Sequence, residues 1–98
     1  MKTIWKYPLQ LRDVQTIKVP SLSNFEDEHG LIWGQVLHIG QQDGIPTLWM
    51  MVDSERDLRE IEIRLIGTGH ECPNSLDYDY LGTTICDPFV WHIFSRVL

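Results

Sequence analysis

The chain has few cysteines, few basic residues and no long apolar run, and each shortage excludes a class of protein. Two cysteines, Cys72 and Cys86, are too few for a disulfide framework, and no C-x-x-C pair marks a zinc ribbon. No Lys or Arg cluster provides the basic surface of a duplex-binding domain. The longest apolar run, residues 48–52, is far shorter than a membrane span, and Lys6 interrupts any signal-peptide pattern. We therefore expect a cytoplasmic protein with reduced thiols that binds neither duplex nucleic acid nor membrane.

The length and charge of the chain fit one small acidic domain, residues 1–98. The net charge of −6 is uneven along the sequence. Residues 1–19 hold four basic residues against one acid, which gives +3, and the remainder holds four against thirteen, which gives −9. An acidic body of this kind can keep a small domain soluble, or can approach a basic surface on a partner protein.

Alternation of apolar and polar residues predicts strands along most of the chain. The expected strands cover residues 3–7, 14–19, 35–39, 48–52, 60–65 and 89–94. Asp43-Gly44 predicts a hairpin turn between two of them. Pro46 lies just past that turn, so the following strand either begins there or lies at a sheet edge. The pattern favours an antiparallel all-β fold, a small barrel or sandwich of about six or seven short strands.

Helical signals are weak in this sequence. Residues 54–60 and 21–30 can each form at most one short helical turn, because neither carries the apolar stripe of a docked helix. Residues 74–80 are expected to form a solvated, tyrosine-rich loop.

Five short motifs occur in order along the chain: Trp5-Lys6-Tyr7-Pro8-Leu9, Gly44-Ile45-Pro46-Thr47-Leu48-Trp49, Gly67-Thr68-Gly69-His70, Tyr80-Leu81-Gly82-Thr83 and Val90-Trp91-His92-Ile93-Phe94. In this order the chain resembles a family of short phage and bacterial proteins of unknown function. The resemblance implies a compact, mainly β fold and a phage or bacterial setting, but no activity, cofactor or catalytic residue. The chain departs from the family pattern at residues 21–29, which are longer and more acidic than the usual connection.

The motif Gly67-Thr68-Gly69-His70 is the candidate ligand site. Two glycines can adopt positive φ and turn backbone N–H groups inward, which makes an anion-binding nest, and Thr68 and His70 add donors. Such a turn could hold a phosphate or a nucleotide. The other interpretation is a strand exit that needs glycine flexibility, because no strand–glycine-rich loop–helix context accompanies the motif.

Two histidines and two cysteines offer further chemistry. His70, Cys72, Cys86 and His92 could in principle form a tetrahedral zinc site, or one Cys–His nucleophilic pair. Their spacing matches no zinc motif, and ordinary reduced thiols are the alternative. We therefore assign no catalytic residue, no metal and no cofactor.

The segment around Trp49 is the candidate interface. Trp49 and Met51 share one face of their strand, and Leu48, Met50 and Val52 share the other, so the strand is apolar on both sides. A homodimer with Trp49 or Met51 at the contact would cover this surface. The alternative is a monomer in which residues 21–30 fold over that surface, with Phe25 as the plug.

These observations predict a non-enzymatic binding protein. Together with the resemblance, they suggest a phage or prophage accessory protein in the host cytoplasm. It would counter host immunity by binding a defence protein or by sequestering a small nucleotide signal. An alternative from another class is a small hydrolase or transferase acting on a phosphorylated substrate, with His70 as acid and base. A structural phage component is a third possibility.

Overall fold

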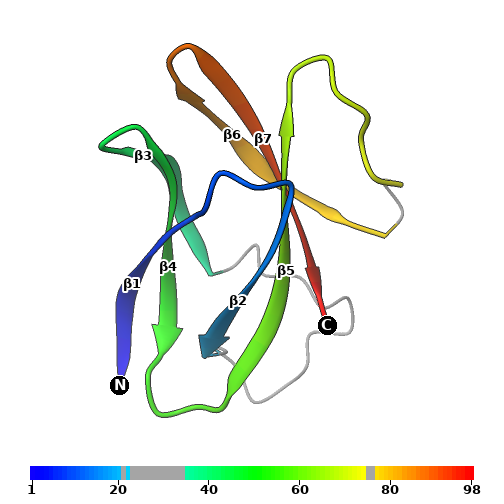
Figure 1. Cartoon of the computed structure of the whole chain (residues 1–98). Helices are drawn as coiled ribbons and strands as arrows, with labels where there is room; N and C mark the ends of the chain where they lie inside the picture. Colours follow the sequence, from blue (N-terminus) through cyan, green and yellow to red (C-terminus); the bar gives the residue numbers. More distant parts are fainter. Residues whose placement is uncertain (21, 23–34, 75–76) are drawn as a thin grey trace.

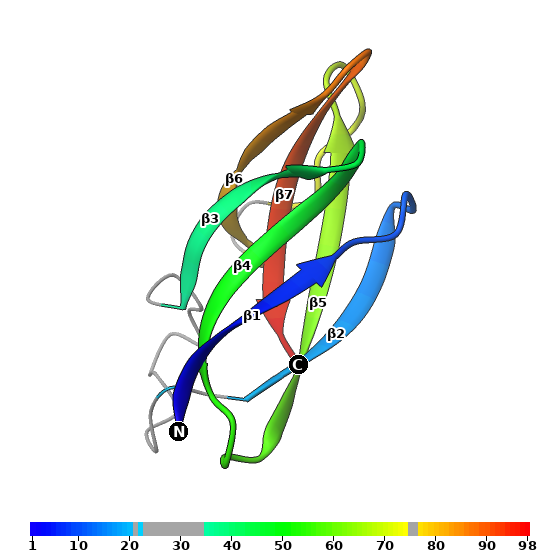
Figure 2. The ribbon, with the colours of Figure 1, turned by 90° about the vertical axis from the view of Figure 1, so that its left-hand side faces the viewer.

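In a computed structural model, the described residues 1–20, 22, 35–74 and 77–98 form seven strands and no helix. The strands are β1 (Lys2–Pro8), β2 (Val14–Pro20), β3 (Val36–Gln42), β4 (Ile45–Asp53), β5 (Leu58–Gly67), β6 (Asp79–Cys86) and β7 (Phe89–Val97). All paired strands are antiparallel, and they form two sheets with the orders β1-β4-β3 and β2-β5-β7-β6. Figure 1 and Figure 2 show the two sheets arranged as a sandwich. The expected all-β fold is confirmed.

The core lies between the two sheets and follows the alternation in the sequence. On β4, Leu48, Met50 and Val52 are fully buried, whereas Trp49 and Met51 on the opposite face are half-buried. The larger sheet contributes inward side chains from β5 and β7: Ile61, Ile63, Leu65 and Ile93. Each strand thus gives one face to the core, because successive side chains of a strand point to opposite sides of the sheet.

The β3–β4 hairpin turns at Asp43-Gly44, as expected. Both residues have positive φ, 54° and 79°, which is the backbone of a type I′ turn. Pro46 is the second residue of β4, so the prediction that a strand begins there holds. The prediction that this strand lies at an edge is wrong, because β4 pairs with β1 on one side and with β3 on the other.

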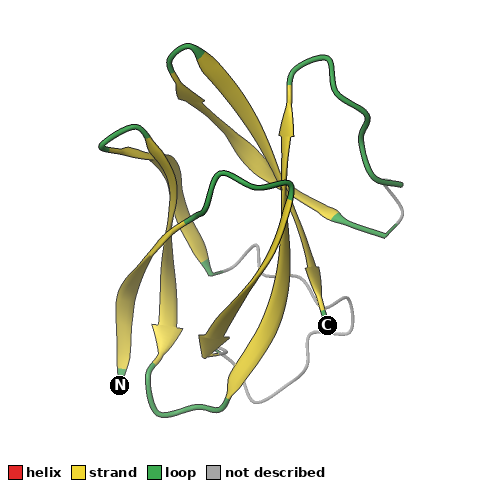
Figure 3. Cartoon of the chain, in the orientation of Figure 1, coloured by secondary structure: helices red, strands yellow, loops and turns green. Residues whose placement is uncertain are grey.

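Two other expectations need correction. Residues 54–57 form turns and bends and β5 begins at Leu58, so the expected helical turn at 54–60 is absent, and Figure 3 shows only strands and loops in the described chain. Residues 79–86 form β6, although the sequence pattern left them without a strand. The second expected helical turn, at residues 21–30, falls outside the described residues except for residue 22. No described segment is a helix of the length and hydropathy needed to cross a membrane.

Contacts between the sheets close the sandwich on both sides. On one side, the Tyr7 hydroxyl in β1 donates a hydrogen bond to the Lys18 carbonyl in β2, at 2.9 Å. Burial raises the pKa of Tyr7, since the charged phenolate is disfavoured away from water. On the other side, β3 packs against β6, and a hollow of about 290 Å³ between them is lined by residues 36–39 and 81–83.

Candidate functional site

The four residues of the predicted ligand site form one tight, largely exposed turn that begins at Gly67, the last residue of β5. The His70 N–H donates to the Gly67 carbonyl at 3.0 Å, and Gly69 has a φ of 90°. The His70 ring lies against Gly67, where an added Cβ would be only 3.2 Å from Nδ1. The ring has no hydrogen-bond partner in the described part of the chain. The acid–base alternative at His70 therefore has no orienting group there.

A hydrogen-bonded chain of side chains leads from this turn across the outer face of the larger sheet. We call it the His92 chain: Thr68, His92, Thr83 and Tyr80. Thr68 Oγ1 is 2.8 Å from His92 Nε2, and Thr83 Oγ1 is 2.9 Å from His92 Nδ1. The Tyr80 hydroxyl in turn bonds to Thr83 Oγ1. Three motifs that are separate in the sequence, those beginning at Gly67, Tyr80 and Val90, each contribute to it.

A β-bulge makes this convergence possible. Tyr80 and Thr83 are three residues apart, so in a regular strand they would point to opposite faces. The register of β6 against β7 shifts between Tyr80 and Gly82, which inserts one extra residue. As a result Tyr80 pairs with Phe94 and Thr83 pairs with His92, and both side chains lie on the outer face.

The His92 chain can be polarised in two directions. A neutral imidazole has one donor and one acceptor nitrogen, and each hydroxyl has one hydrogen. In the first direction Tyr80 donates to Thr83, Thr83 to Nδ1, and Nε2–H to Thr68, which leaves the Thr68 hydroxyl hydrogen free. In the second direction every bond is reversed and the Tyr80 hydrogen is free. Both ring nitrogens are occupied in either case, so His92 acts here as an orienting group.

A second cluster on the same face anchors Tyr78. The Tyr78 hydroxyl donates to Glu62, and Arg64 Nε donates to the Tyr78 oxygen at 2.8 Å. Arg96 pairs with Glu62 at 3.2 Å, and the Arg64 and Arg96 guanidinium carbons lie 5.1 and 5.0 Å from the centre of the Tyr78 ring. The prediction of a solvated loop at 74–80 is therefore wrong for Tyr78, which is half-buried and held by cation–π and hydrogen-bond contacts.

The outer face of the smaller sheet has a different character. Trp49 and Met51 lie on it beside Ile4, whose side chain is 55% exposed, and the His38 ring lies 5.3 Å from the Trp49 ring. A shallow hollow of about 350 Å³ on this side is lined by Lys2, Thr3, Ile4 and Met51. Phe25, the expected plug over this surface, lies outside the described residues.

The remaining candidate residues are not brought together. Cys72 is exposed after the turn, Cys86 is buried at the end of β6, and both thiols are free. Among the described residues, no three His, Cys, Asp or Glu side chains are grouped so that they could hold a metal ion. The tetrahedral zinc alternative thus has no assembled ligand set in this part of the chain.

Sequence reasoning found the turn but missed its partners. Thr83 and Tyr80 were singled out only as part of a motif, and His92 only as a possible metal ligand or base. The available signal was Gly82, because an isolated glycine in a strand often marks a bulge. Pairing Thr83 with His92 also requires the register of β6 on β7, which alternation alone does not fix.

Comparison with known proteins places the chain by family alone. No curated protein and no solved structure matches the chain. The family model described as "Domain of unknown function (DUF7352)" matches residues 1–98, so the chain belongs to this family.

Proposed function

We propose that the protein is a non-enzymatic binding protein whose ligand face is the outer face of the β2-β5-β7-β6 sheet. The observation that supports this proposal is the His92 chain, in which hydroxyl and imidazole groups from three segments of the protein are held in fixed positions. Beside it lie Tyr78, Arg64 and Arg96, residue types that often dominate binding energy at interfaces. Side chains fixed before binding lose little entropy on binding, which favours recognition.

We place this binding protein among phage or prophage accessory proteins that counter host immunity in the host cytoplasm. It would occupy either a host defence protein or a small nucleotide signal. Support for this setting comes from the ordered motifs that resemble short phage and bacterial proteins. Engagement of both His92 nitrogens favours binding over turnover.

An infection assay tests this function. The protein is expressed in bacteria that carry single defence systems, some signalling through nucleotides and some not, and plaque formation is measured. We expect the wild-type chain to restore plaques on at least one strain, and Tyr80→Ala with Arg96→Ala to abolish the effect. Leu11→Ala with Arg12→Ala, at exposed positions of the connection between β1 and β2, outside the strands of this face, is the matched control and should retain it. Wild-type protein that restores plaques on no strain would overturn the proposed function.

The opposite face suggests how the protein assembles. We propose that the outer face of the β1-β4-β3 sheet is covered by a second copy of the chain, with Trp49 and Met51 at the contact. On this face Trp49 and Met51 are half-buried, and Ile4 is exposed beside Met51. Apolar surface that stays partly exposed on a small domain is commonly covered by a partner, and one self-complementary patch is sufficient for a two-fold dimer. A dimer of this kind leaves both ligand faces accessible.

A further inference from the structure

We propose that the turn Gly67–His70 binds a phosphate group, with the Thr68 hydroxyl as its central donor and the His92 chain as the device that aims this hydroxyl. The inference rests on the proposed function and names the ligand class of that face. It adds Tyr80, Thr83 and His92 as positioning residues, which have no contact with the phosphate itself.

The turn supplies donors that the protein does not itself use. The Gly69 N–H has no backbone acceptor among the described residues, while the His70 N–H closes the turn by bonding to Gly67. The Thr68 hydroxyl contacts His92 and lies on an exposed residue. The His70 ring lies against Gly67 on the same turn. An amide, a hydroxyl and an imidazole within three consecutive residues suit an oxyanion, since hydrogen bonds to charged oxygens are the stronger ones.

An anion at Thr68 would select one of the two directions of the His92 chain. To donate to the anion, Thr68 must accept from His92, so Nε2 carries the hydrogen and Nδ1 accepts from Thr83. Thr83 then accepts from Tyr80, and all the donors point towards the ligand. Such aligned hydrogen bonds polarise one another and strengthen the last one. The tautomer of His92 is therefore a direct report on the bound state.

The charges near the turn set the conditions for binding. Glu71 follows His70 and is exposed, so its repulsion of an anion is screened by solvent. Two cationic side chains, Arg64 and Arg96, lie on the same outer face, and both pair with Glu62, at 4.0 and 3.2 Å. Free phosphate and phosphate carried by a nucleotide present the same chemistry to Thr68.

Nuclear magnetic resonance on the isotope-labelled full chain tests the proposal, with inorganic phosphate and adenosine monophosphate as separate probes. We expect saturable shifts of the Gly69 and His70 amides, and a move of His92 to the tautomer with hydrogen on Nε2. Thr68→Val should weaken binding about tenfold, the loss expected for one hydrogen bond to a charged group. Thr68→Ser, which keeps the hydroxyl, should bind as the wild type does. Binding of the nucleotide alone, rather than of both probes, would identify the carried phosphate as the ligand.

The positioning role of Tyr80 and Thr83 is tested separately from the direct contact between Thr68 and phosphate. Tyr80→Phe and Thr83→Val should weaken binding less than Thr68→Val does, and His92 should still carry its hydrogen on Nε2 when phosphate is bound. Thr83→Ser, which keeps the hydroxyl that bonds to Nδ1, should bind as the wild type does. Thr16→Val, on β2 of the same sheet, should change neither affinity nor tautomer. Absence of saturable shifts with both probes overturns the proposal, as does unchanged affinity in folded Thr68→Val. If Thr68→Val does not fold, equal phosphate affinity of the wild type and Thr68→Ala overturns the proposal.

The two proposals fail in different ways. If neither probe binds while the wild-type chain restores plaques, the ligand face acts on a protein and only the phosphate proposal falls. If phosphate binds as described while no strain regains plaques, the phosphate site stands and the proposed function falls.

Discussion

At the scale of single residues, Gly82 determines how closely β3 and β6 approach each other. It has a φ of 152°, and a Cβ at this position would lie 2.7 Å from Ile39 Cδ1. Its bulge also turns Tyr80 and Thr83 to the same face, so one glycine serves both the packing of the sheets and the His92 chain. A larger residue here would act on the fold and on the site together.

We expect Gly82→Ala to lower the free energy of unfolding by about 2–4 kcal/mol, from backbone strain and overpacking combined. Gly44→Ala is the control, because Gly44 also has positive φ but has no atom within 4 Å of the added Cβ. It should cost only about 1 kcal/mol. Urea unfolding measures both. Ile39→Val removes the clashing methyl group, so it should recover part of the loss in the Gly82→Ala background. If the two substitutions change the free energy of unfolding additively in the double variant, the added Cβ at position 82 does not contact Ile39 Cδ1.

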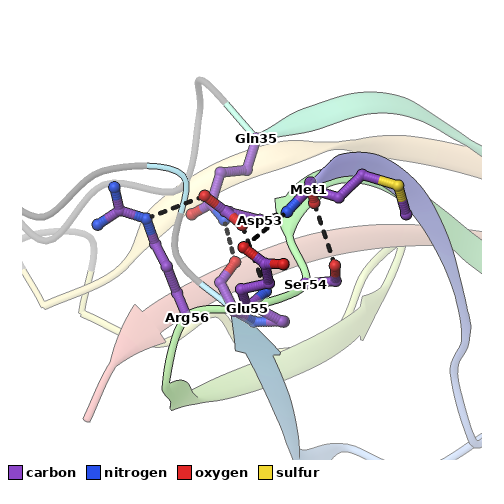
Figure 4. A network of polar contacts seen from close by, with 7 residues as sticks. Met1, Gln35, Asp53, Ser54, Glu55 and Arg56 are labelled. Atoms are coloured by element: carbon purple, nitrogen blue, oxygen red, sulfur yellow. Dashed lines mark hydrogen bonds and ion pairs between the residues drawn. The ribbon is translucent and has the colours of Figure 1, made fainter.

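At the scale of elements, a polar network joins the start of β1 to the end of β4, as Figure 4 shows. Asp53 accepts hydrogen bonds from the Met1 ammonium at 3.0 Å, the Glu55 N–H at 3.3 Å and Arg56 Nε at 3.3 Å. The ammonium is the main cause, and the Glu55 amide a further one, of a lowered Asp53 pKa. The same hydrogen bond raises the pKa of the ammonium. The network holds the β1–β4 pair at its open end.

The pH dependence of this network has a defined sign. The Asp53 pKa is lowered in the folded state. Its contribution to the free energy of unfolding is therefore complete above the unfolded pKa of about 3.9, and it is lost as the pH falls through the folded pKa. Because the ammonium pKa is raised, its contribution is complete below about 8 and is lost as the pH rises through the folded value. Asp53→Asn should therefore be less stable than the wild type near neutral pH, and the difference should close in acid.

Urea unfolding between acid and neutral pH measures this difference. Ser54→Ala is the control, since the Ser54 hydroxyl donates to the neutral Met1 carbonyl at 3.2 Å and its loss should cost the same at every pH in this range. A wild-type advantage over Asp53→Asn that persists unchanged below the unfolded Asp pKa would show that the carboxylate charge does not contribute.

At the scale of the whole molecule, the two outer faces of the sandwich differ in chemistry. The larger sheet carries the His92 chain and the Tyr78 cluster, while the smaller sheet carries Trp49, Met51 and Ile4. The proposed dimer contact and the proposed ligand site therefore lie on opposite sides of the core. A substitution on one face should therefore leave the function of the other face unchanged.

Sedimentation at micromolar concentration tests the assembly. We expect the wild-type chain to sediment with the mass of two 11.5 kDa chains, and Trp49→Asp to sediment as a folded monomer that still binds through the other face. Thr16→Asp, at an exposed position of the larger sheet, should remain a dimer. A monomeric wild-type chain, with Trp49→Asp changing only stability, would place Trp49 among the structural residues and end the dimer proposal.

The alternation of side chains along the sequence determined much of this fold. Six of the seven described strands were predicted, because burial on one face enforces a two-residue period. The hairpin at Asp43-Gly44 followed from local backbone preference, which two residues are enough to specify. The turn at Gly67–His70 was located for the same reason.

The features that depend on pairing between distant segments were decided only by the tertiary structure. β6 was missed because a bulge at Gly82 breaks its alternation, and β4 became a central strand because β1, at the start of the sequence, pairs with its other edge. Thr68, Thr83 and His92 meet only when three strands are in register. Local sequence fixes which face a side chain occupies, but the register and the order of strands come from the packing of the whole core, and this packing placed the His92 chain beside the turn.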